Sequence, residues 1–81
     1  MPLPSAEQLY NPLLEAMARL GGSASILELD EAVTQRLSLT EQEVNQPHDE
    51  RISELAYRLA WARTHLKMYG LMNNSERGVW D

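Results

Sequence analysis

The sequence contains no cysteine and no apolar run long enough to cross a membrane. Without cysteine, disulfide bonds, zinc ribbons and thiol nucleophiles are all excluded. The chain opens with Met1-Pro2-Leu3-Pro4, which has neither the basic nor the apolar segment of a signal peptide. These absences predict a cytoplasmic protein that does not engage a membrane.

Sequence motifs of catalysis are missing as well. There is no Gly-x-Ser-x-Gly nucleophile turn and no glycine-rich loop with Walker or Rossmann spacing. His48-Asp49-Glu50 contains metal-ligand residue types, but adjacent side chains point in different directions and rarely converge on one ion. The sequence therefore predicts a protein that is not an enzyme and holds no cofactor or metal.

Charge is distributed unevenly over the 81 residues, whose formal net charge is −5. Residues 1–50 contain two basic and nine acidic residues, whereas residues 51–81 contain five basic and three acidic residues. This asymmetry favours one face suited to a negatively charged partner. An acidic solvated surface with scattered arginines is the alternative interpretation.

The first half of the chain shows two helices and a turn. Residues 1–4 are expected to be a flexible lead-in to one domain over residues 5–81. The first helix lies within residues 5–20 and begins either at a Ser5/Gln8 capping box or at Asn11 followed by Pro12. Ser25 with Glu28, and Thr40 with Glu43, predict capping boxes for a second helix and for a short helical turn over 41–45.

The second half is predicted to form the longest helix and a hairpin. The helix runs from about Arg51 to Tyr69, and its buried positions are expected to be Leu55, Leu59, Ala62, Leu66 and Tyr69. Leu71-Met72 and Val79-Trp80 flank a turn, which is typical of a β-hairpin, and Leu66 and Trp80 should be buried. The fold class is thus mainly α, a winged helix-turn-helix with three helices and a C-terminal hairpin wing.

Several short motifs occur in a fixed order along the chain: Asn11-Pro12-Leu13-Leu14-Glu15-Ala16, Leu37-Ser38-Leu39-Thr40, Trp61-Ala62-Arg63, Leu66-Lys67, Gly70-Leu71 and Arg77-Gly78-Val79-Trp80. Together they resemble the N-terminal domain of Mrr-type restriction endonucleases. The resemblance implies a winged-helix reader of double-stranded DNA that precedes a separate nuclease domain in a longer parent chain. The catalytic residues of that family's nuclease domain include a lysine two positions after an acidic residue. The only lysine here, Lys67, follows His65 at that distance, so the resemblance implies no cleavage by this chain.

The outer side of the long helix is the predicted DNA-binding surface. Its small, polar and basic side chains suit a major groove, with hydroxyls for hydrogen bonds and cations for phosphates. The residues expected to contact DNA are Tyr57, Arg63, Thr64, Lys67 and, on the wing, Arg77. Trp61 is expected to pack against the core.

One domain with a net charge of −5 should bind DNA weakly, so tight binding would need a homodimer or the longer parent chain. The alternative function is protein docking or dimerisation.

Overall fold

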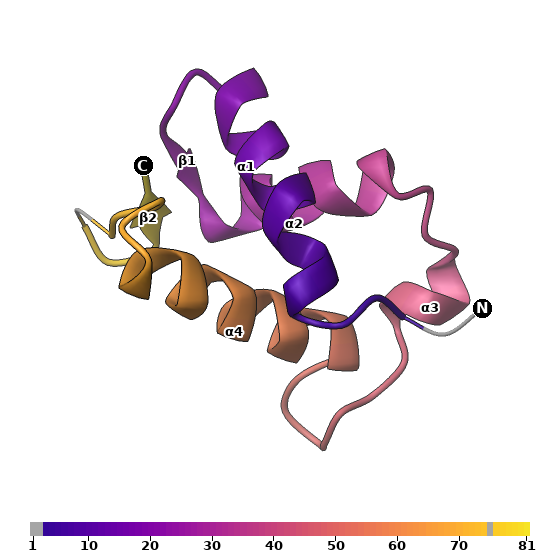
Figure 1. Ribbon diagram of the computed structural model, residues 1–81. Helices are drawn as coiled ribbons and strands as arrows, with labels where there is room; N and C mark the ends of the chain where they lie inside the picture. Colours follow the sequence, from indigo (N-terminus) through magenta and orange to yellow (C-terminus); the bar gives the residue numbers. More distant parts are fainter. Residues whose placement is uncertain (1–2, 75) are drawn as a thin grey trace.

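The computed structural model describes residues 3–74 and 76–81 and confirms the mainly α winged-helix class (Figure 1). The elements follow in the order η1 (Glu7–Leu9), α1 (Tyr10–Arg19), β1 (Ala24–Ser25), α2 (Ile26–Arg36), α3 (Glu41–Val44), α4 (Glu54–Met68) and β2 (Val79–Trp80). Helices α1, α2 and α4 pack around one core, and the small sheet lies at the C-terminal end of α4.

Of the two predicted starts of the first helix, the structure contains the Ser5/Gln8 capping box. Ser5 and Gln8 exchange two hydrogen bonds, at 2.9 and 3.2 Å, and the chain then makes the 3₁₀ turn η1 before entering α1. Pro12 is the third residue of α1, where its missing N–H has no carbonyl partner within the helix. Asn11 therefore lies inside α1 and does not cap it.

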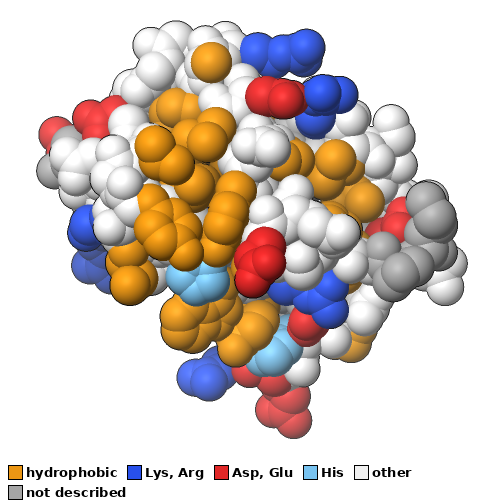
Figure 2. Space-filling view, viewed as in Figure 1, with side chains coloured by type: hydrophobic (Ala, Val, Ile, Leu, Met, Phe, Trp, Pro, Cys, Tyr) orange, Lys and Arg blue, Asp and Glu red, His pale blue; other side chains and the backbone are white. Residues whose placement is uncertain are grey.

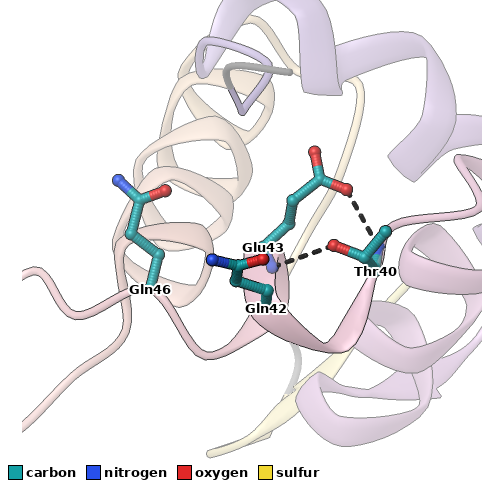
Figure 3. Close-up of a pocket in the computed structure, with 4 residues that line it drawn as sticks. All are labelled: Thr40, Gln42, Glu43 and Gln46. Carbon is teal, nitrogen blue, oxygen red and sulfur yellow. Dashed lines mark hydrogen bonds between the residues drawn. The ribbon is translucent and has the colours of Figure 1, made fainter.

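The next two helices begin at the predicted caps. Ser25 and Glu28 form a complete capping box at α2, and Thr40 and Glu43 form another at α3. Figure 3 shows the Thr40/Glu43 box. In each box a hydroxyl accepts from the third backbone N–H of the helix, and the glutamate carboxylate accepts from the capping residue's N–H. Local hydrogen bonds thus fix both helix starts.

The longest helix begins later than the sequence analysis placed it. Its cap is Ser53, whose hydroxyl accepts from the Ala56 N–H, and its first residue is Glu54 where about Arg51 was expected. The Asp49 carboxylate accepts hydrogen bonds from the Arg51 and Ile52 N–H groups, which hold this segment in a turn of its own. A short acidic side chain competes in this way with helix formation by the backbone.

The core is a single cluster of buried apolar side chains from every major element. It contains Leu3, Leu9, Leu13, Ala16, Met17, Ala24, Leu29, Val33, Leu55, Leu59, Ala62, Leu66, Met72 and Trp80. The predicted burial of Leu66 and Trp80 is confirmed, whereas Tyr69 is 65% exposed because it follows the last residue of α4. No helix in the described part of the chain is both long and apolar enough to span a bilayer.

The N-terminal segment is attached to α4. The side chain of Arg58 donates hydrogen bonds to the carbonyls of Leu3 and Pro4, at 2.9 and 3.1 Å. Leu3 is buried in the core. These two residues therefore differ from the flexible lead-in expected over residues 1–4, and Met1 and Pro2 lie outside the described residues.

The C-terminal strand pairs with a different segment from the one predicted for the hairpin. Val79–Trp80 pairs antiparallel with β1, so that Ala24 lies opposite Trp80. Leu71 and Met72 do not form the other strand of the hairpin, because their N–H groups donate to the Leu66 carbonyl and close the end of α4. Asn73 and Asp81 exchange two backbone hydrogen bonds, at 2.7 and 2.8 Å. These bonds join the two ends of the wing just after Met72 and Trp80.

Candidate nucleic-acid interface

The side of α4 turned away from the core presents a mixed, carboxylate-free surface. We call it the outer face, and it consists of Tyr57, Ala60, Trp61, Thr64, Lys67 and Met68. Each of these positions is three or four residues from another of the set, so they form a continuous side of the helix opposite the buried leucines. All of them except the half-buried Ala60 are exposed.

Four of the five predicted DNA-contacting residues are exposed. Tyr57 and Lys67 lie near opposite ends of α4, and Arg77 lies in the turn before β2. Thr64 is also exposed, and its hydroxyl donates to the Ala60 carbonyl at 3.0 Å, leaving oxygen lone pairs free to accept. The geometry therefore leaves these four side chains accessible to a partner.

Arg63 was predicted to face outward, and this orientation is wrong. The residue is 6% exposed, and its Nη1 donates to the Asp30 carboxylate on α2 at 2.7 Å. The guanidinium also lies 5.9 Å from the Trp80 ring centre. Burial raises the pKa of Asp30, and the Arg63 charge acts in the opposite direction. Arg63 thus joins α2, α4 and the wing and cannot reach a groove.

Two other cations are also occupied within the fold. Arg58 pairs with Glu54 at 2.9 Å, and Arg36 pairs with Glu15 at 2.8 Å. Within the described ranges, the exposed cations outside ion pairs are Arg19, Arg51, Lys67 and Arg77. The outer face itself carries only one positive charge, Lys67, and is less basic than the sequence suggested.

A row of aromatic rings at the surface, four of them exposed and two half-buried, is the feature that sequence reasoning missed. We call it the aromatic strip, and it consists of His48, Tyr57, Trp61, His65, Tyr10 and Tyr69. Figure 2 shows apolar side chains gathered over α1 and α4, with both histidines among them. Tyr57, Trp61, His65 and Tyr69 are spaced by four residues, and this spacing is the sequence signal that could have revealed the strip.

Consecutive rings of the aromatic strip are in contact. His48 stacks on Tyr57 with centres 3.8 Å apart, and Tyr57 and Trp61 meet edge to face at 6.4 Å. His65 lies 5.7 Å from Trp61 and accepts or donates a hydrogen bond with the Tyr10 hydroxyl, according to its tautomer. Partial burial raises the pKa of Tyr10, and the neighbouring Tyr69 adds to the shift. Trp61, predicted to pack in the core, is 48% exposed.

A hollow of the surface lies beside α3 and is lined by polar side chains. The hollow beside α3 in Figure 3 is lined by Thr40, Gln42, Glu43 and Gln46. Thr40 and Glu43 are already bonded to each other in the capping box, which leaves two glutamine amides. Among residues 3–74 and 76–81, no group of three or more histidine or acidic side chains is placed to hold a metal ion.

Comparison with known proteins identifies the chain's relatives at the level of the family. The family model described as "Mrr N-terminal domain" matches residues 7–81, which include every helix and both strands. No curated protein and no solved structure gave a match.

Proposed function

Since the chain belongs to the Mrr N-terminal domain family, we propose that it is a winged-helix module that binds double-stranded DNA through the outer face of α4. The observation that carries the proposal is the chemistry of that face. It is exposed, free of carboxylates, and combines two hydroxyls with Lys67. Helices that enter a major groove use such side chains for base-edge and phosphate contacts.

Four side chains of the outer face and Arg77 on the wing have distinct roles in this arrangement. Ala60 is small and allows close approach of the helix backbone to the groove. Tyr57 and Thr64 supply hydrogen bonds, Lys67 contacts a phosphate at the end of α4, and Arg77 on the wing contacts a second phosphate. Arg63 is no longer part of the contact set, because it is buried against Asp30.

Binding by the single domain should be weak and sensitive to salt. Two or three neutralised phosphates give a slope of log affinity against log salt of about −2 to −3. The dissociation constant should lie in the range of non-specific binding, about 10⁻⁴–10⁻⁶ M. In this proposal the chain recognises DNA, and cleavage is carried out by a nuclease domain that we propose as its partner in a longer parent chain.

An NMR titration with a short DNA duplex tests the proposal. Backbone shifts should concentrate on α4 and the turn around Arg77, and Lys67→Glu should weaken binding while the fold is retained. Arg19→Glu is the matched control, since it reverses an exposed charge at the end of α1 instead. Shifts confined to α1, or equal affinities for the Lys67→Glu and Arg19→Glu variants, would contradict the proposal.

Protein docking is the second function that an observation favours. The aromatic strip is a row of six rings in contact with one another, unlike isolated aromatic side chains at a surface. Part of the strip lies outside the outer face. The strip and the outer face share Tyr57 and Trp61.

A further inference from the structure

His48 packs against the N-terminal end of the outer face. Its ring is stacked on that of Tyr57, with the centres 3.8 Å apart and an interplanar angle of 11°. The Nδ1 of His48 shares a hydrogen bond with the Glu54 carboxylate at 2.7 Å. Glu54 also accepts from Arg58 at 2.9 Å, and Arg58 in turn donates to the N-terminal segment. One stacked ring and one hydrogen bond therefore hold the imidazole against α4.

The second ring nitrogen of His48 is available to a partner. Nε2 lies across the imidazole from Nδ1 and has no hydrogen-bond partner among the residues that the structure describes. The side chain is 34% exposed and lies beside Tyr57, a residue of the proposed DNA contact. A protonated imidazole donates from both nitrogens. Nε2 can therefore donate to a phosphate while Nδ1 stays bound to Glu54.

The charges around His48 leave this end of α4 with an excess of acid. The charged side chains of the preceding loop and of the first turns of α4 are Asp49, Glu50, Arg51, Glu54 and Arg58. Three are acidic and two are basic, and the other titratable group in contact with the imidazole is Tyr57. Hydrogen bonds from His48 and from Arg58 lower the pKa of Glu54, so its carboxylate stays ionised. Protonation of His48 cancels the single excess negative charge.

We propose that His48 is a further DNA-contacting residue, which strengthens binding to duplex when its imidazole is protonated. The inference rests on the proposed duplex binding and adds a dependence on pH. Lys67 and Arg77 provide cations at the C-terminal end of α4 and on the wing, whereas His48 provides one at the N-terminal end. Because histidine titrates between about pH 5 and about pH 8, binding takes up a proton and affinity rises as pH falls through that range.

Fluorescence anisotropy with a labelled duplex tests the proposal. Affinity is measured at about pH 8 and about pH 6, each at several salt concentrations. The unmodified chain should bind about two- to fivefold more tightly at the lower pH, as expected for one exposed ion pair. The slope of log affinity against log salt should also steepen by up to about 0.9, because one more phosphate is neutralised.

Three variants separate the charge of His48 from its packing. His48→Gln keeps a donor for Glu54 but does not titrate, so its affinity should lose the dependence on pH. His48→Arg is charged throughout, so at the higher pH it should bind like the unmodified chain at the lower one. His65→Gln is the matched control, since His65 is half-buried beside Tyr10 and lies outside the outer face. Circular dichroism should show that all three variants are folded at both pH values.

The possible results distinguish this inference from the proposed function. Measurable affinity that is equal at the two pH values would overturn the inference and leave the proposed duplex binding intact. A pH dependence that His48→Gln retains, or that His65→Gln removes, would overturn it in the same way. Absence of duplex binding at both pH values would overturn the proposed function, and this inference with it.

Discussion

Arg63 is a cation of α4 that the fold uses internally. It follows Ala62 on the helix, and α2 packs beside it with the Asp30 carboxylate within 2.7 Å. Removing one member of a buried ion pair leaves an uncompensated charge and costs about 3–5 kcal/mol. We therefore expect Arg63→Ala to destabilise the domain by about that amount in urea-induced unfolding.

Arg36→Ala is the control for this prediction. Its partner is Glu15, and both side chains are about half exposed, so the loss should be under about 1 kcal/mol. Equal losses for the two variants would show that Arg63 is not buried in solution. The comparison also explains why Arg63 variants cannot report on DNA contact, because unfolding would imitate a loss of binding.

Residue orientation could be predicted only in part, for a physical reason. The helical period gave Leu55, Leu59, Ala62 and Leu66 as buried, and all four are. The period does not reveal how wide the buried side is, and this width depends on the helix that packs beside it. Helix α2 covers Arg63, whereas nothing in the described residues covers Trp61, so both residues were assigned to the wrong side.

Elements fixed by neighbouring residues were predicted well. The capping boxes of α2 and α3 depend on contacts three residues apart, which the sequence displays directly. The wing was harder to predict, because β2 pairs with β1, more than fifty residues away in the chain. A pattern of two apolar runs around a turn does not specify which distant segment will become the partner.

The capping boxes make a pH-dependent contribution to stability. Hydrogen bonds from the backbone and hydroxyl of Ser25 lower the pKa of Glu28, and those of Thr40 lower the pKa of Glu43. A lowered pKa in the folded state means that this contribution is present above the unfolded-state value of 4.5 and is lost as pH falls through the folded-state value. We expect the contribution of the two boxes to the free energy of unfolding to decrease between about pH 6 and about pH 3.

Replacing both carboxyls tests the origin of this decrease. The Glu28→Gln, Glu43→Gln double variant keeps hydrogen-bond acceptors without titrating groups, so it should lose less stability on acidification. The Glu31→Gln, Glu50→Gln double variant removes as many exposed carboxylates outside the boxes and should behave like the unmodified chain. If the two double variants respond alike, the capping boxes are not the source.

In the whole molecule, acidic and basic residues lie mainly in different parts of the fold. The acidic first half forms α1, α2 and α3, and the cations of the second half are divided between internal ion pairs and a few exposed positions. The net charge therefore opposes approach to DNA, and the exposed cations outside ion pairs in the described part of the chain are Arg19, Arg51, Lys67 and Arg77. The proposed DNA contact uses only Lys67 and Arg77 among them, so its orientation depends on specific contacts as well as on the distribution of charge.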